Sequence, residues 1–294
     1  MPDKGEAEYK SGWHLRLSTF PPLRRVALHA TLLLLCTWVM APLMWVVLHS
    51  LKAGPFKYFE HVWPVEFQDP LWANYRWLWQ DATLENPFYR SLSHSALIAL
   101  LTIASTTVAA VMAGYALSHL STPGKSVVLG VLVASMFFPT QVTALTGLFQ
   151  IQHRLGLIDR PWSLFFPYTA MMVAVSVFVM RGVFQAVPKE IVDAARVDGA
   201  GSFRTLGILL PMVRNGIVVV MILSFNLAWG SISLASTLVN RRENWTLAVL
   251  LGQGMGVSPW SAAVLVIAIL PALAAFGIAQ HWFIRGLQDG ALRG

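Results

Sequence analysis

Long apolar runs separated by polar segments dominate the chain, and the lengths of these runs predict its elements. A helix that crosses the hydrocarbon core of a bilayer needs about 20 apolar residues. The runs that meet this length are residues 26–50, 92–117, 127–149, 162–184, 213–238 and 262–284. The pattern therefore predicts an all-α integral membrane protein with six transmembrane helices.

Residues 187–211 form the most polar internal segment, and their pattern predicts two short helices joined by a tight turn. Pro188 suits the first helical position, because its missing N–H would be unpaired there anyway. Gly199 is expected to end this helix, since glycine readily adopts the left-handed backbone that closes helices. Ser202 is expected to cap the second helix.

The first of these short helices has a small apolar face and a charged face. Ala194 and Ala195 leave a shallow depression in which a partner's side chain can sit. Lys189, Asp193 and Arg196 are spaced by four and three residues, which lets their charges pair along the helix surface. The pattern predicts a soluble docking device between two membrane helices.

Composition supports the membrane interpretation. Of the 294 residues, 56% are hydrophobic and 12% are charged, whereas roughly 25% of the residues in soluble domains are charged. Six spans and their loops leave no room for a separate soluble catalytic domain. Cys36 is the only cysteine, which excludes a disulfide framework or a cysteine metal site within the chain.

The formal net charge of +7 bears on membrane topology. With six spans both termini lie on one side, and most of the 21 lysines and arginines then lie on that side. Since the positive side is cytoplasmic, we expect the 187–211 segment inside the cell. The expected organisation is a cytoplasmic tail at 1–25 without a removable signal peptide, a membrane domain at 26–284 and a cytoplasmic tail at 285–294.

Other function classes fit the pattern less well. A membrane-embedded enzyme needs clustered carboxylates, histidines or a metal motif, whereas His94, His119, His153 and His281 are scattered along the chain. An ion-coupled secondary transporter usually carries charges inside its spans, and the apolar centres here contain essentially none. The sequence has no phosphate-binding Gly-x4-Gly-Lys-[Ser/Thr] loop, so nucleotide is expected to bind a separate subunit.

Polar residues inside the predicted spans are candidates for a solute path. They are Gln141, Thr143, Ser176, Ser224, Asn226 and Ser231. For serine and threonine the alternative is a bond to a helix carbonyl or across helices. The Asn226 amide is costly in a membrane unless paired, so we expect it to face the bundle interior or a water-filled path. Trp229, one turn further on, offers a stacking surface for a sugar ring or, alternatively, an interfacial anchor.

The outer loop at residues 51–90 is rich in tryptophan. Trp63, Trp72, Trp77 and Trp79 lie there among prolines and acids. Such aromatic residues mark the membrane interface or, alternatively, form a rim on which an external partner docks.

The sequence DAARVDG at 193–199, with Leu210 and Pro211 further on, resembles the conserved cytoplasmic loop of ABC importer permeases, Glu-Ala-Ala-x3-Gly-x9-Ile-x-Leu-Pro. Asp193 replaces the usual glutamate. The stretch from Gly199 to Pro211 is one residue shorter than the family form, which would rotate the second helix by about 100° unless the turn absorbs it.

Further stretches resemble the carbohydrate branch of these permeases, the second permease subunit of maltose-type and glycerol-phosphate-type importers. They are SLKAGP at 50–55, ANYRWLW at 73–79, AGYALSHLSTPGK at 113–125, HRLGLIDRPWSLFFPY at 153–168 and WFIRGLQDGALRG at 282–294. One departure concerns the fifth span, where the family commonly has Trp-Asn-Glu or Trp-Asn-Asp and this chain has Trp229, Gly230 and Ser231.

The resemblance implies a type I ABC importer permease in a bacterial or archaeal inner membrane, without catalytic, metal or cofactor residues of its own. Its implied partners are a second permease, two cytoplasmic ATPase subunits that bind ATP and Mg²⁺, an external solute-binding protein and membrane lipid, but no nucleic acid. The implied solute is a sugar, oligosaccharide or related polyhydroxylated compound, with a non-carbohydrate solute as the alternative. The residues expected to couple to the ATPase are Glu190, Asp193, Ala194, Ala195, Asp198, Gly199 and Pro211.

Overall fold

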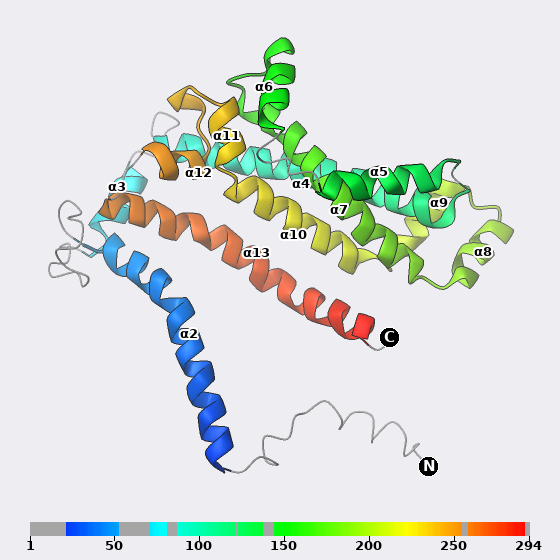
Figure 1. The fold of residues 1–294 in the computed structure, drawn as a ribbon, viewed down its shortest axis with the longest axis horizontal. Coiled ribbons are helices and arrows are strands. Elements are labelled where there is room, and N and C mark those ends of the chain that lie inside the picture. Colours follow the sequence, from blue (N-terminus) through cyan, green and yellow to red (C-terminus); the bar gives the residue numbers. More distant parts are fainter. Residues whose placement is uncertain are drawn as a thin grey trace.

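The computed structural model describes residues 22–52, 71–80, 87–121, 123–137, 144–254 and 258–291, which form helices joined by turns (Figure 1). The longer helices are α2 (Pro22–Ser50), α4 (Pro87–His119), α5 (Lys125–Phe137), α6 (Leu145–Arg154), α7 (Phe165–Gln185), α10 (Arg214–Gly230) and α13 (Pro259–Ala291). The shorter ones are α3 (Ala73–Gln80), η2 (Pro161–Leu164), α8 (Lys189–Val197), α9 (Ser202–Leu209), α11 (Ser233–Leu238), η3 (Arg242–Asn244), α12 (Leu247–Val249) and the π-helical η4 (Leu250–Gly254).

Helices α4, α7 and α10 pack along one another and form the centre of the bundle (Figure 1). Two glycines allow the close approach. A Cβ at Gly114 of α4 would lie 2.7 Å from the Cβ of Met180 in α7, and one at Gly216 of α10 would lie 2.8 Å from Cγ2 of Val183. Small residues at crossings let helix backbones approach in this way, which makes van der Waals packing the main source of association in lipid.

Apolar clusters hold the two ends of the bundle. At one end Tyr115, Phe184 and Val192 share a buried cluster with residues of α9 and α10, so the short helix α8 is packed onto the bundle. At the other end Tyr168 packs with buried residues of α4, α10 and α11. Phe88 lies in a further cluster that joins α3, α4, α12 and α13. The α8–α9 segment and the α3, α11 and α12 group therefore occupy opposite ends of the molecule (Figure 1).

Four of the predicted spans are single helices long and apolar enough to cross a membrane. They correspond to the runs at 26–50, 92–117, 162–184 and 262–284. Helix α4 has 33 residues and is therefore about 50 Å long, well over the roughly 30 Å of a hydrocarbon core. Helix α13 extends from Pro259 to Ala291 and includes the whole of the predicted sixth span.

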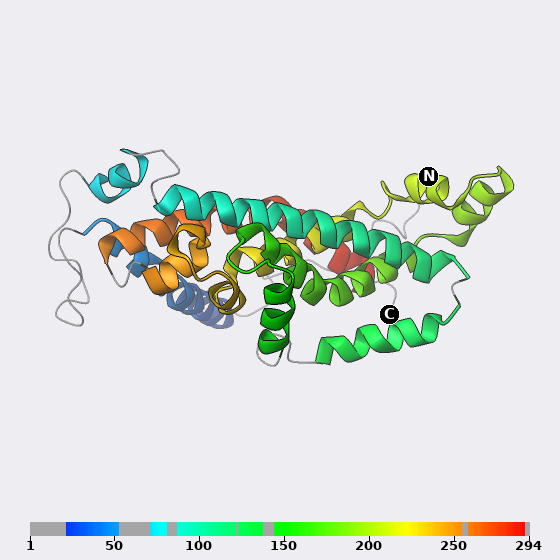
Figure 2. The ribbon, with the colours of Figure 1, turned by 90° about the horizontal axis from the view of Figure 1, so that it is seen from above.

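The third predicted span, 127–149, is not one helix. Helix α5 ends at Phe137 and α6 begins at Leu145, with residues 138–143 outside the described part of the chain. The described part of α6 begins after a turn residue, Ala144, so α6 is a helix with a start of its own. With 13 residues, α5 is only about 20 Å long, and Figure 2 shows it to one side of the central bundle.

The fifth predicted span, 213–238, is also divided. Helix α10 ends at Gly230, and after Ser231 and Ile232 the separate helix α11 begins. Towards its start, α10 makes an angle of 85° with α9. The continuous apolar run did not reveal this break, because hydropathy reports how favourably side chains transfer into lipid and says nothing about the direction of the backbone.

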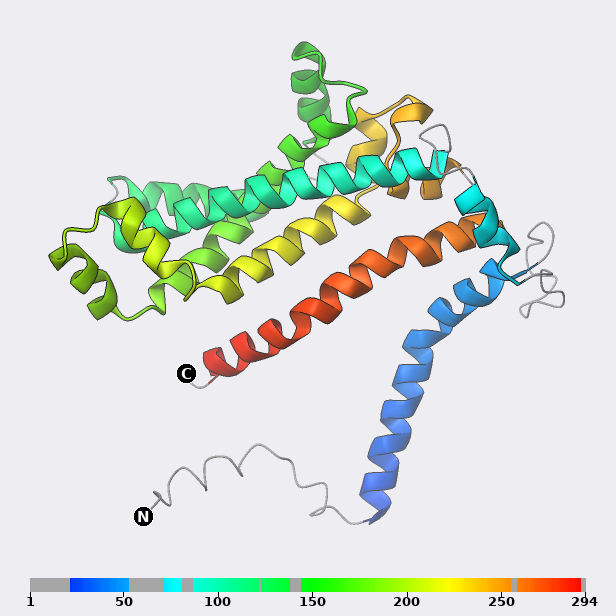
Figure 3. The same cartoon turned by 180° about the vertical axis from the view of Figure 1, so that it is seen from behind.

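Helix α2 is the least buried of the spans. No residue in its most apolar window is buried, although the helix contacts α13. Figure 3 shows that the two helices lie close where α13 begins and then diverge, so that most of α2 extends away from the bundle.

Candidate functional site

The α8–α9 segment ends its first helix at the predicted glycine. Gly199 has φ of 73°, its N–H donates to the carbonyl of Arg196 at 3.0 Å, and the N–H of Ala200 donates to the carbonyl of Ala195 at 2.9 Å. These two bonds are the Schellman arrangement, which satisfies the last carbonyls of a helix through a left-handed residue. The predicted two-helix segment with a glycine turn is confirmed.

Two details of the predicted caps differ. Pro188 precedes α8 as its N-cap, with an extended ψ of 132°, and Lys189 is the first helical residue. Ser202 is the first residue of α9 and not its cap; Gly201 holds the cap position at φ −68° and ψ 167°, without a side-chain cap bond. The chain thus enters each helix from an extended residue. Helix α8 begins one residue later than predicted, and α9 begins one residue earlier.

The two alanines of α8 lie on different faces of the helix. Ala195 is 7% exposed and lies, like Val192, against the rest of the chain, whereas Ala194 is exposed. Of the two alanines predicted to face a partner, only Ala194 is therefore exposed on this chain. The large side chains that face outward are Val197, 87% exposed, and Phe203 of α9, 79% exposed.

The charged residues of α8 lie on its surface. Arg196 and Asp193 form the predicted pair at 3.7 Å, and Arg196 also donates to the backbone carbonyl of His119 at 2.7 Å. Glu190, Asp198 and Pro211 are exposed as well. The structure therefore brings the coupling-loop candidates together on one short segment, with only Ala195 inside.

Gly199 permits a direct test of the backbone requirement. A Cβ at Gly199 or at Gly201 meets no atom within 4 Å, so neither site lacks space for a side chain. Gly199 has a positive φ, whereas Gly201 has the extended backbone of an N-cap. Gly199→Val is expected to destabilise the turn by about 1–2 kcal/mol and to lower ATP-driven uptake, with Gly199→Asn milder because asparagine tolerates this backbone. Gly201→Val is the control. Equal uptake in the two valine variants would contradict the prediction.

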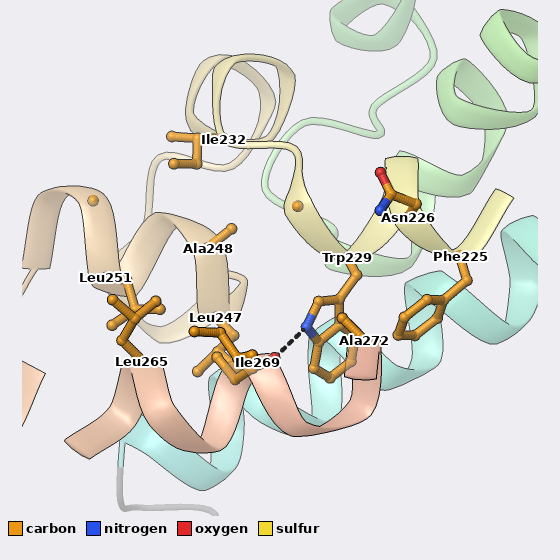
Figure 4. A pocket seen from close by; sticks show the side chains of 13 residues that line it. Phe225, Asn226, Trp229, Ile232, Leu247, Ala248, Leu251, Leu265, Ile269 and Ala272 are labelled. Carbon is orange, nitrogen blue, oxygen red and sulfur yellow. Dashed lines mark hydrogen bonds between the residues drawn. The ribbon is translucent and has the colours of Figure 1, made fainter. Parts of the chain in front are cut away.

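A cavity of about 440 Å³ lies between α10, α12, η4 and α13. Its wall is formed by Phe225, Asn226, Trp229, Gly230, Ile232, Leu247, Ala248, Leu251, Gly252, Leu265, Ala268, Ile269 and Ala272. In Figure 4 the rings of Phe225 and Trp229 lie between α10 and α13, and Asn226 lies at the edge, farther from α13. Asn226 and Trp229, both predicted path residues, thus line the same cavity.

Trp229 fixes one wall of this cavity. Its indole N–H donates to the carbonyl of Ala268 in α13 at 3.0 Å. Its ring stacks on that of Phe225, with centroids 5.3 Å apart and planes inclined by 24°. Because the N–H is engaged by α13, the indole is held in place while part of its surface remains available to the cavity.

The other predicted path residues do not share this wall. Ser224 is fully buried and donates to the carbonyl of Val220, the within-helix bond weighed as the alternative. Ser176 is fully buried in α7, and Ser231 lies at the break between α10 and α11. Gln141 and Thr143 lie outside the described residues.

A protein-family model covers both the segment and the cavity. Residues 105–289 match the family described as the binding-protein-dependent transport system inner membrane component. This chain belongs to that family. The matched part of this inner membrane component includes α7 to α12 and most of α13.

Relatives of this inner membrane component match over nearly their whole length. The sulfoquinovosyl glycerol transport system permease protein SmoH of Agrobacterium fabrum is 31% identical, over 93% of this chain and 94% of that protein. The trehalose/maltose transport system permease protein MalG of Thermococcus litoralis is 28% identical, over 92% of this chain and 98% of its own. The chain therefore resembles sugar transport permeases along its full membrane domain.

A solved structure supports the fold of this inner membrane component. It is a bacterial ABC transporter involved in the import of the acidic polysaccharide alginate, with a TM-score of 0.75 and 19% identity over 90% of this chain and 99% of that chain. At that identity the likeness concerns the fold alone. It shows that most of this chain shares the fold of a chain of that ABC transporter.

Asp159 of this inner membrane component joins two loops through hydrogen bonds, a role that the sequence analysis did not predict. It has φ of 60°, and its Oδ1 accepts bonds from the backbone N–H groups of Asn240 and Arg241 at 2.6 and 2.8 Å. Asn244 donates to its carbonyl at 2.7 Å. The Leu-Gly-Leu-x-Asp resemblance at 155–159 was the available signal, because a short acid is a residue type that tolerates positive φ.

Proposed function

We propose that this chain is one of two membrane-spanning subunits of an importer that carries a sugar, oligosaccharide or related polyhydroxylated solute across the inner membrane. ATP hydrolysis on separate subunits would supply the energy. The names of the relatives, which include sulfoquinovosyl glycerol and trehalose/maltose permeases, support a carbohydrate or glycoside as the solute class.

The observation that carries this proposal is the α8–α9 segment. It projects at one end of the α4, α7 and α10 bundle (Figure 1), and Val197 and Phe203 are its most exposed large apolar side chains. Highly exposed apolar side chains on a segment outside the long apolar helices are candidates for a protein contact. A cytoplasmic ATPase subunit is the partner that family membership implies for it.

The proposed solute path passes the cavity wall made by Asn226 and Trp229. Ligand sites are concave and mostly apolar, with a few polar groups that fix orientation. The Trp229 ring presents a flat surface to the C–H face of a sugar ring, and the Asn226 amide offers both a donor and an acceptor to hydroxyl groups. Gln141, Ser224 and the remaining polar span residues belong to the wider set of path candidates.

The proposed cycle uses the partners that the resemblance implies. ATP and Mg²⁺ bind two cytoplasmic ATPase subunits, and closure of that pair moves α8. The spans of this chain and of the second permease then change from inward-facing to outward-facing, where an external binding protein delivers the solute. Each ligand shifts this equilibrium only through its different affinity for the two states.

In the proposed topology the chain crosses the membrane six times, with α5–α6 as the third crossing and α10–α11 as the fifth, and both termini are cytoplasmic. A cysteine placed in exposed Ser121 should then be shielded from an impermeant thiol reagent in intact cells, whereas one at exposed Asn240 should react. A Cys36→Ser background removes the native thiol. Labelling of position 121 from outside would overturn the topology.

Reconstitution tests the function itself. The chain, its second permease and the ATPase pair would be placed in proteoliposomes containing ATP, with the binding protein and radiolabelled saccharides outside. Uptake that requires both internal ATP and the binding protein is the expected result. Failure to accumulate any saccharide, together with uptake of another solute class, would reject the carbohydrate assignment.

A further inference from the structure

Arg196 links α8 to the end of another helix. Its Nη2 donates to the backbone carbonyl of His119, the last residue of α4, at 2.7 Å, and its Nη1 lies 3.7 Å from Oδ1 of Asp193. The last four carbonyls of a helix have no partner within the helix, and a cation stabilises that end. One arginine therefore both terminates α4 and ties α8 to it, across 77 positions of sequence.

The end of α4 is in turn fixed to α7. A ring nitrogen of His119 lies 3.1 Å from the carbonyl of Phe184, and the rings of Tyr115, His119 and Phe184 contact one another with centroids 5.7 to 6.1 Å apart. Val192 of α8 belongs to the same buried cluster as Tyr115 and Phe184. Polar and apolar contacts thus join three helices at one point.

We propose that Arg196 is a positioning residue that makes α8 move as one body with the ends of α4 and α7, so that motion imposed on α8 reaches the spans. This inference rests on the proposed function. Val192 supplies non-directional packing, on which α8 can slide, whereas the hydrogen bond from Arg196 fixes one direction and register.

The first test uses the reconstituted importer and compares Arg196→Ala with Arg204→Ala. Both variants remove one arginine from an exposed position of the α8–α9 segment. In Arg196→Ala the ATPase subunits should still co-purify, but solute transported per ATP hydrolysed should fall about threefold to tenfold, as expected for loss of a charge-assisted hydrogen bond at a partly exposed site. Arg204→Ala should keep the wild-type ratio.

A wild-type ratio in Arg196→Ala, or an equal fall in both variants, would overturn the inference. Arg196→Lys keeps a cation with N–H donors but loses the planar guanidinium fork, so it should recover part of the ratio. Absence of uptake by the wild-type complex would instead count against the proposed function, so the two failures are distinguishable.

A covalent link provides a second test. It distinguishes the proposed mechanical link between α8 and α4 from a role of Arg196 limited to capping α4. Cysteines replace Ser121 and Arg196 in a Cys36→Ser background and are joined by a short bifunctional thiol reagent in the complete complex. Because the inference requires α8 and α4 to move together, the cross-link should restore the transport ratio lost in Arg196→Ala. A cross-linked complex that stays uncoupled, or that stops transporting, would show that α8 must move against α4.

Discussion

Changing Val197 or Phe203 to aspartate is expected to detach the ATPase subunits while the permease remains folded and inserted. The two side chains are 87% and 79% exposed, so a carboxylate at either place is solvated in the isolated chain. Docking would bury it without a partner, at a cost of several kcal/mol, and would lose about 1.5–3 kcal/mol of apolar burial. Since about 1.4 kcal/mol corresponds to a tenfold change, docking should weaken far more than tenfold.

The measurement is titration of the purified ATPase onto the permease pair in lipid nanodiscs. Leu155→Asp is the matched control, because Leu155 is also an exposed apolar residue, 65% exposed, but follows α6 at a distance from the α8–α9 segment. ATPase binding that is unchanged in Val197→Asp and Phe203→Asp would mean that another surface carries the contact.

Trp229→Ala is expected to lower solute uptake at least tenfold. The substitution removes a partly buried indole that stacks on Phe225, bonds to Ala268 and forms one wall of the cavity. A loss of about 1.4 kcal/mol of solute binding already corresponds to a tenfold change. Trp229→Phe keeps an aromatic ring but loses the N–H. Its solute uptake should lie between those of the wild type and Trp229→Ala, since a net hydrogen bond is worth about 0.5–1.5 kcal/mol. Uptake kinetics at several solute concentrations measure both variants.

Asn226→Ala separates solute binding from packing at the same cavity. Asn226 is exposed at the cavity edge, so this variant should raise the solute concentration needed for half-maximal uptake without reducing assembly. Asn215→Ala on the same helix and Trp260→Ala on α13 are controls, because neither residue lines the cavity. Normal uptake in Trp229→Ala and Asn226→Ala would return both residues to a packing role.

Local signals in the sequence predicted the α8–α9 segment well. A glycine that follows an amphipathic stretch of nine residues marks the end of a helix whatever the surroundings, so Gly199 could be identified without knowledge of the fold. The sequence could not show which of the two alanines on α8 faces inward. Ala194 and Ala195 are chemically identical, and only the packing of α8 on the bundle, through Val192, decides that Ala195 is the buried one.

Long-range contacts account for most of what the sequence did not reveal. The bond from Arg196 to His119 and those from Asn240 and Arg241 to Asp159 join residues 77 or more positions apart, and no local pattern records them. Hydropathy likewise predicted the positions of the spans but not the interruptions within the third and fifth of them. Pro139 and the Gly230–Ser231 pair were the available signals for the interruptions after α5 and α10.

The separation of α2 from the bundle bears on how the chain enters the bilayer. Because no residue of its most apolar window is buried by the rest of the protein, α2 can leave the insertion machinery and reside stably in lipid as soon as it is synthesised. Helix α10 differs, since it has 17 residues, stands at 85° to α9 and buries its packing face on α4 and α7. Biogenesis therefore has an order: an autonomous first anchor, then a group of helices that settle in the membrane only by assembling with one another.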